Sequence, residues 1–308
     1  MSARPLRYLL VFLIVPLVLG PLLAPWVYLG LQKLVGFSWF SGLAEERFER
    51  VATRTVQVIA LLLVWPCLKR SETIERVAPM MRWSHGRVRA FLGWAAIGTA
   101  MIAVVYGVGV LVGNYSLSEK YWGTPKLYSR ASGFLLGATL VGVLEEYLFR
   151  GFIFGALRSR FSFASAAIAS SAFFSSLHFF RPRLPTPLTE MTWSSGFQLF
   201  PHMFELFKPL YDWDYALTLF FMGIILCALL VRHGHLYGIA GLHAGWVWAL
   251  QTGALVFDQR PEHHSFLFGW GDGAAQGALV TFLALILAIY ACRTRDRASS
   301  ERDAAPAD

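Results

Sequence analysis

Long apolar stretches separated by short charged segments make up most of the chain. An α-helix needs about 20 consecutive apolar residues to cross a bilayer. Windows of this kind occur at 8–31, 53–68, 89–113, 132–157, 162–180, 215–232, 236–257 and 274–292. The pattern therefore predicts an all-α, polytopic integral membrane protein with about eight transmembrane helices.

The composition agrees with this environment. Of the 308 residues, 56% are hydrophobic and only 15% are charged, and the mean hydropathy is +0.51. Such values are typical of a chain whose main solvent is the lipid bilayer. We expect one integral membrane domain over 1–292, followed by a polar, charged tail at 293–308 that is too poor in apolar residues to fold.

The net charge of +8 does not indicate nucleic acid binding, because the basic residues cluster at the ends of apolar segments. Positive residues accumulate in cytoplasmic loops. With eight spans, one side holds the arginine-rich loop 69–89, both chain ends and the turns near 158 and 232, so both termini are predicted to be cytoplasmic. Compact loops and this charge bias favour a bacterial inner membrane.

One predicted span contains three charged residues. Window 132–157 includes the sequence Glu145-Glu146-Tyr147-Leu148-Phe149-Arg150. Each charge at the centre of such a helix costs about 2.5–3.5 kcal/mol, so chains seldom keep three without a use for them. Glu146 and Arg150 are four residues apart and share a helix face, where they can pair.

Glu145 is rotated by about 100° from Glu146 and has no such partner on its own helix. It is therefore the candidate general base. A polar clamp that only joins two helices is the alternative interpretation of this motif.

His178 is the second candidate. The connection between windows 132–157 and 162–180 is short, so the two helices run antiparallel, and Glu145 lies level with about residue 175. His178 is then about 4.5 Å away along the helix axis. We expect it to assist Glu145, although a histidine at a helix end can also be an interfacial residue.

His243 is the third candidate. The small residues Gly238, Gly241, Ala244 and Gly245 surround it and allow close helix approach. We expect its imidazole to point toward the centre of the bundle, and a position at the lipid headgroups is the alternative. The remaining histidines are assigned to turns or loops: His85, His202, His233, His235, His263 and His264.

These residues resemble the motifs of the CPBP intramembrane endopeptidases, also called the Abi or type II CAAX prenyl endopeptidase family. The family signature is EExxxR, then FxxxH, then a further histidine, each on its own helix. It is matched by Glu145-Glu146-x-x-x-Arg150, Phe174-x-x-x-His178 and His243. The resemblance covers about 130–255.

The resemblance implies an eight-helix bundle with a water-filled polar cavity inside the membrane. It also implies cleavage of a membrane-anchored protein or peptide near its C-terminus or membrane segment. Glu145, helped by His178, would activate a water molecule, and His243 would help to stabilise the oxyanion. Glu146 and Arg150 complete the implied site.

The chain departs from the family pattern at one position. Many members have asparagine four residues after the last histidine, where this chain has Val247. Loss of one oxyanion donor costs about 2.7–4 kcal/mol in a known protease. Either Trp246, Gln251 or a backbone N–H group replaces it, or this member is slower.

A zinc site is the alternative to metal-free catalysis. Two histidines and one or two glutamates can hold a hydrolytic zinc ion, here His178, His243, Glu145 and Glu146. No HExxH sequence is present, and Arg150 beside Glu146 would repel a dication. We therefore expect no cofactor, with zinc as the alternative.

A different class of function is also compatible with these residues. A buried glutamate–arginine–histidine set could serve a non-enzymatic scaffold, an immunity-type protein or a proton-coupled transporter. The internal repeats that would support a transporter are not evident. Within the protease hypothesis, the sequence does not choose among CAAX tails, bacteriocin precursors and C-terminal sorting tails.

Overall fold

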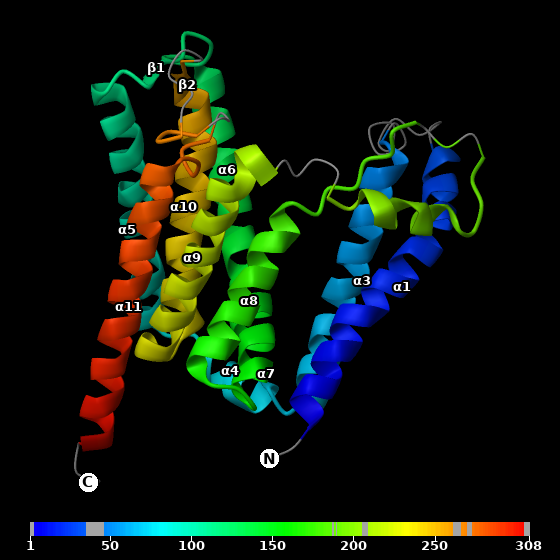
Figure 1. Ribbon diagram of the computed structural model, residues 1–308, viewed down its shortest axis with the longest axis horizontal. Helices are drawn as coiled ribbons and strands as arrows, with labels where there is room; N and C mark the ends of the chain where they lie inside the picture. Colours follow the sequence, from blue (N-terminus) through cyan, green and yellow to red (C-terminus); the bar gives the residue numbers. More distant parts are fainter. Residues whose placement is uncertain are drawn as a thin grey trace. The chain divides into compact units, whose positions relative to one another are not determined.

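The computed structural model describes residues 3–34, 46–186, 188, 190–204, 209–260, 266–269 and 273–304, without the side chains of 209–211 and 296–304. The chain forms two compact units. Unit 1 contains 1–74 and 176–208, and unit 2 contains 75–175 and 209–308. Nearly all of the described structure is helical (Figure 1), which confirms the all-α prediction.

Unit 1 is built on a pair of long helices. α1 (Arg4–Gln32) packs along α3 (Phe48–Arg70), and the short 3-10 helix η2 (Ser195–His202) packs against α1. The two long helices approach closely at Gly20, where any β-carbon would collide with Val56 of α3. A glycine is therefore required for this contact.

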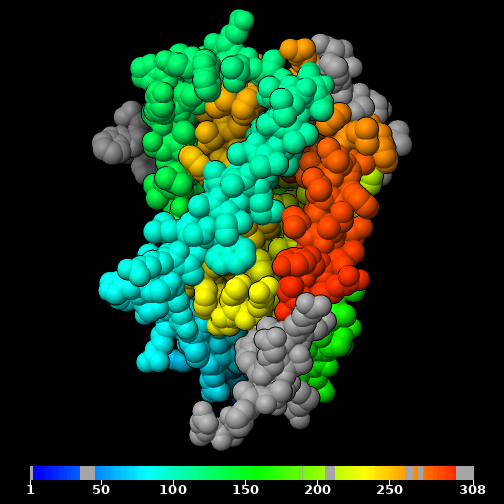
Figure 2. All heavy atoms as spheres, turned by 90° about the vertical axis from the view of Figure 1, so that its left-hand side faces the viewer, coloured from blue at the N-terminus to red at the C-terminus, as the bar shows by residue number. Residues whose placement is uncertain are grey.

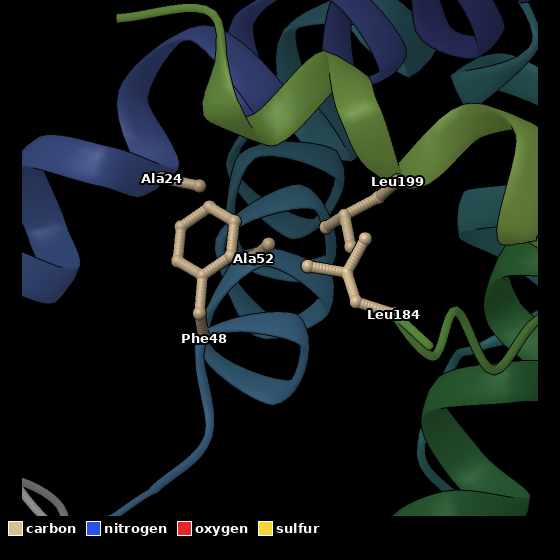
Figure 3. Close-up of a cluster of buried hydrophobic side chains, with 5 residues drawn as sticks. All are labelled: Ala24, Phe48, Ala52, Leu184 and Leu199. Atoms are coloured by element: carbon tan, nitrogen blue, oxygen red, sulfur yellow. The ribbon is translucent and has the colours of Figure 1, made fainter. Parts of the chain in front are cut away.

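A small apolar core joins the parts of unit 1. In Figure 3, side chains from α1, α3, η2 and the extended segment before η2 converge on one point; they are Ala24, Phe48, Ala52, Leu184 and Leu199. The Glu49 carboxylate accepts hydrogen bonds from the Leu184 N–H group at 3.2 Å and from the Arg47 guanidinium at 2.7 Å. The extended segment is thus fixed to α3 by both apolar and polar contacts.

Unit 2 contains the remaining helices. They are α4 (Ile74–Met80), α5 (His85–Leu111), α6 (Pro125–Glu146), η1 (Tyr147–Phe154), α7 (Gly155–Arg158), α8 (Phe163–His178), α9 (Pro209–His233), α10 (Leu236–Val256) and α11 (Ala278–Ala304). The last three residues of α8 fall in unit 1. α10 packs against both α5 and α6, and α11 packs against α9 (Figure 1).

A seam of glycines lets α5 and α10 pack backbone to backbone. A β-carbon at Gly98 of α5 would collide with the carbonyl oxygen of Leu242, and one at Gly241 of α10 would collide with that of Phe91. Such close approach is typical of helix pairs in membranes. There the hydrophobic effect does not drive helices together, because lipid is as apolar as the side chains, and van der Waals packing supplies the attraction. The seam therefore fixes the position of α10, the helix that contains His243.

Two short strands that the sequence did not predict close one end of unit 2. β1 (Tyr115–Leu117) follows α5, β2 (Phe257–Gln259) follows α10, and they pair antiparallel with Tyr115 opposite Gln259. Pairing satisfies backbone groups that would otherwise lie exposed just beyond two apolar helices. The strands therefore tie the ends of α5 and α10 together.

All eight predicted spans coincide with helices: α1, α3, α5, the continuous run α6–η1–α7, α8, α9, α10 and α11. Within the described residues, six of these are long and apolar enough to cross a membrane, and α8 and α10 are not among them. α8 has only 16 residues, and α10 includes the polar residues His243 and Gln251. The helix positions are confirmed, and the number of crossings stays a prediction.

The C-terminal helix extends beyond its predicted span. α11 continues to Ala304, whereas the apolar window ends at 292. Residues 305–308 lie outside the described part of the chain. The expected disordered tail from 293, and the expectation that 1–292 behaves as one domain, both stay predictions.

The glycine seam gives a testable expectation for stability. Gly98→Ala should destabilise the protein by about 1–3 kcal/mol, because the new methyl group must push α5 away from the α10 backbone. Gly107→Ala is the matched control on the same helix, since a β-carbon there meets nothing within 4 Å. Thermal unfolding of purified protein should show a lower midpoint only for Gly98→Ala. Equal midpoints for the two variants would contradict the seam.

Candidate active site

The candidate site begins where an α-helix widens into a π-helix. Glu145 and Glu146 are the last two residues of α6, and Arg150 lies in η1, an eight-residue π-helix. π-helical turns are rare and frequently occur at functional sites, because the wider spacing redirects side chains without ending the helix. The two glutamates thus precede this change in helix geometry, and Arg150 follows it.

Glu146 is completely buried and holds two partners with one oxygen. Its Oε1 accepts a hydrogen bond from Arg150 Nη1 at 2.9 Å and lies 2.8 Å from His243 Nδ1. The side chains of Glu146 and Arg150 are both 0% exposed. The predicted pair between Glu146 and Arg150 is therefore present, and the structure adds His243 as a third member.

Two aromatic rings and a carbonyl oxygen surround the Arg150 guanidinium. It lies 4.6 Å from the ring centre of Phe174 and 5.8 Å from that of Phe149, and Nη2 donates to the Gly223 carbonyl at 3.4 Å. Cation–π contacts of this kind are strongest where water is absent. They supplement the charge of Glu146 in holding Arg150 inside the helix bundle.

Phe174 is a site residue whose role the sequence did not reveal. Its ring contacts Arg150 and also meets the His243 ring edge to face at 5.9 Å. The FxxxH motif includes it, but an apolar residue on an apolar helix gives no sign of a charged neighbour. Only the tertiary packing of α8 against η1 and α10 brings the three side chains together.

Glu145 differs from Glu146 in both exposure and partners. Its side chain is 33% exposed, and Oε2 lies 3.8 Å from His243 Nε2, which is too long for a direct hydrogen bond. Within the described residues, the second oxygen of each glutamate has no hydrogen-bond partner. The two carboxylates thus differ in that Glu146 is held through Oε1, whereas Glu145 is partly exposed and beyond hydrogen-bonding distance of His243.

His243 lies between the two carboxylates. Nδ1 faces Glu146 and Nε2 faces Glu145, so the ring has one nitrogen for each. A carboxylate that accepts from one ring nitrogen fixes the orientation of the whole imidazole. The side chain is only 7% exposed, as expected for an imidazole that points into the bundle, and its depth in the membrane stays a prediction.

Small residues bring the backbones of α6 and α10 close together beside His243. A β-carbon at Gly142 would lie 2.8 Å from the Ala240 carbonyl oxygen and 3.0 Å from the Ala244 nitrogen. Gly142 is one helical turn before Glu146. Close approach at this point is what allows the short His243 side chain to reach both glutamates.

The third motif residue, His178, is the last residue of α8 and belongs to unit 1, whereas the glutamates and His243 belong to unit 2. The expected pairing of His178 with Glu145 therefore stays a prediction.

The histidines at the turn before α10 have a structural role. His235 Nδ1 accepts a hydrogen bond from the Gly238 N–H group at 3.4 Å and so caps the first turn of α10. Burial, assisted by the positive charge of Arg87, lowers the pKa of His235. The neutral ring that can accept this bond is therefore favoured. His263 and His264 lie outside the described residues.

The oxyanion donor that would replace the family asparagine is not identified by the geometry. Trp246 is buried at 2% exposure, and Gln251 is exposed. The neighbouring Trp248 donates its indole N–H to the Ala131 carbonyl at 2.9 Å, so that group is already used. The substitute for the missing amide stays a prediction.

The described residues contain no group of three or more histidine, cysteine, aspartate or glutamate side chains placed to hold a metal ion. Glu146 already binds a guanidinium and an imidazole through Oε1. Glu145 and His243 Nε2 alone provide two ligands, whereas catalytic zinc sites use three protein ligands. The zinc alternative also uses His178, which belongs to unit 1, so the choice between zinc and metal-free catalysis stays a prediction.

Residues 128–249 match the family model described as "Rce1-like: Type II CAAX prenyl endopeptidase Rce1-like". The matched segment contains all three motifs and nearly all of the core expected at 130–255. No curated protein and no solved structure matches the chain. Residues 128–249 are therefore similar to the Rce1-like family of type II CAAX prenyl endopeptidases, the resemblance that the motifs indicated.

Proposed function

We propose that the protein is an intramembrane endopeptidase in which Glu145 activates a water molecule. The observation that carries this proposal is the unequal treatment of the two glutamates. The Glu146 side chain is 0% exposed and is bound to Arg150 and His243, whereas the Glu145 side chain is 33% exposed and lies 3.8 Å from His243, beyond hydrogen-bonding distance. A general base needs access to water and an oxygen free to accept a proton.

The contacts suggest a role for each side chain. A water held at the Glu145 carboxylate gives its proton to that group, and the resulting hydroxide attacks the scissile carbonyl carbon. His243 helps to stabilise the oxyanion, for which Nε2 must carry a proton while Nδ1–H is held by Glu146. The proton on Glu145 then passes to the leaving amine as the C–N bond breaks, with His178 assigned to assist Glu145.

Arg150 acts on the reaction through Glu146. Its guanidinium neutralises a carboxylate that would otherwise carry an unpaired charge inside the bundle, and it fixes the Glu146 oxygen that orients His243. Buried ionic groups of this kind persist when further hydrogen bonds and contacts compensate the loss of water. Arg150 and Glu146 are therefore assigned as positioning residues.

The proposed substrate is a membrane-anchored protein or peptide that is cut near its C-terminus or membrane segment. The support is the family match together with the helices long and apolar enough to span a bilayer. A CAAX-type tail, a bacteriocin precursor and a C-terminal sorting tail each present a bond at membrane depth. We propose the bacterial inner membrane as the location, with both termini in the cytoplasm.

A non-enzymatic scaffold is the second candidate, because the bonds among Glu146, Arg150 and His243 are those that a structural clamp would use. The clamp gives no reason for Glu145, which lies beyond hydrogen-bonding distance of His243. Glu145 is therefore the residue at which the two functions make different predictions.

The first test compares protein termini in cells that make equal amounts of wild-type protein, Glu145→Gln or Glu119→Gln. Glu119 is an exposed carboxylate in the loop after β1 and serves as the control. Mass spectrometry of membrane-protein termini should show a new terminus with wild type and Glu119→Gln and none with Glu145→Gln. Identical profiles in all three strains would contradict the protease and favour the scaffold.

The second test distinguishes metal-free catalysis from the zinc alternative. Once a substrate is known, purified enzyme treated with a strong chelator should keep its full rate, because the guanidinium of Arg150, bound to Glu146, would repel a dication at this site. A known zinc protease assayed in the same buffer is the control. Loss of activity that returns when zinc is added would contradict the metal-free mechanism.

A further inference from the structure

A second polar feature of unit 2 lies away from the candidate active site, where α5 ends and α11 begins. A cavity of about 60 Å³ lies between these helices. It has room for about four water-sized groups. The walls are mostly apolar side chains of the two helices, and the polar side chains among its lining residues are Asn114, Tyr115 and Gln276.

Two side-chain amides at this cavity have unused hydrogen-bonding groups. Asn114 is completely buried and its Nδ2 donor has no partner in the described structure, nor does the Oε1 acceptor of Gln276. A buried polar group without a partner is costly, so such groups normally bind water or a ligand. The cavity thus offers one free donor and one free acceptor.

Neighbouring groups hold the Asn114 amide in place. The Gln259 side chain donates to Asn114 Oδ1 at 3.4 Å, and the Asn114 backbone bonds with Gly109 and Arg260. The backbone beside Gln276 is held as well, because the Gly277 N–H group donates to the buried carboxylate of Asp214.

The cavity continues into a surface that faces lipid. Val104 and Val108 of α5 and Leu283 of α11 line it and are 64%, 40% and 45% exposed. Both helices are candidate membrane spans. Figure 2 shows α5 and α11 side by side near this end of unit 2 and farther apart toward the other end. An apolar groove therefore leads from the membrane interior to the two buried amides.

The depth of these groups indicates the kind of molecule that fits. Asn114 lies three residues after the end of α5, and Gln276 lies two residues before the start of α11. In a helix that spans the bilayer, these positions are at the boundary between hydrocarbon and headgroups. Acyl chains meet the uncharged ester groups of a glycerolipid at the same boundary.

We propose that this groove is a binding site for one glycerophospholipid. An acyl chain lies along Val104, Val108 and Leu283, and an ester carbonyl accepts a hydrogen bond from Asn114 Nδ2. Among the described residues, no charged side chain lines the cavity, which suits the uncharged ester region. Arg260, which is exposed and whose backbone contacts Asn114, supplies positive charge for the phosphate.

The test uses full-length protein in nanodiscs of phosphatidylethanolamine and phosphatidylglycerol, with a trace of phosphatidylglycerol that carries a diazirine in its acyl chain. After irradiation, mass spectrometry should find the cross-links concentrated on peptides with residues 104–108 and 279–283. Val108→Trp, which fills the groove, should lower these cross-links about tenfold. Val110→Trp is the matched control, since Val110 is also 40% exposed on α5 but does not line the cavity.

A second measurement uses unmodified protein and does not depend on the folding of a variant. Native mass spectrometry should show one retained lipid, and an ether-linked analogue without the ester carbonyl should be retained about fivefold less, the effect of one lost hydrogen bond. Cross-links spread evenly over all exposed helices, equal effects of Val108→Trp and Val110→Trp, or equal retention of ester and ether lipids would overturn the proposal. A site that holds only water would give these results.

Discussion

The bonds that Glu146 makes with Arg150 and His243 are the interaction on which the site depends. An isolated charge in this position would cost several kcal/mol, and the cost falls only when the geometry satisfies both ions. Here one carboxylate oxygen serves a guanidinium at 2.9 Å and an imidazole at 2.8 Å, while aromatic rings cover the guanidinium. The arrangement fixes His243 at the same time as it neutralises Arg150. Glu145, one residue earlier, is left partly exposed.

The backbone geometry allows these three side chains to meet. The π-helix after Glu146 keeps Arg150 within reach while the chain continues toward α7. Glycines at the contacts of α10 with α5 and α6 remove side chains that would separate the helices. Without close approach at Gly142, the histidine could not bridge two carboxylates on the neighbouring helix. The small residues at the contacts of α10 are therefore as necessary for the site as its polar residues, because they allow the close helix packing that places His243.

Much of this could be predicted from sequence because the signals are local. The apolar windows located the helices, and the four-residue spacing of Glu146 and Arg150 gave their pair. Small residues around His243 indicated its buried position. Contacts between distant segments could not be foreseen: Phe174 against Arg150, or the single histidine between two carboxylates. The π-helix has no residue signature, and β1 and β2 are too short for a periodic pattern.

The central claim is a division of roles in which Glu146 holds the site together and Glu145 performs the chemistry. The most direct test is to measure thermal unfolding and product formation on the same purified samples of Glu145→Gln and Glu146→Gln. Glu145→Gln should unfold like wild type and form no product. Glu146→Gln should lose about 3–5 kcal/mol of stability, because it leaves Arg150 buried without its counter-ion. If Glu145→Gln is the destabilised variant, or if it still cleaves substrate at the wild-type rate, the account is contradicted.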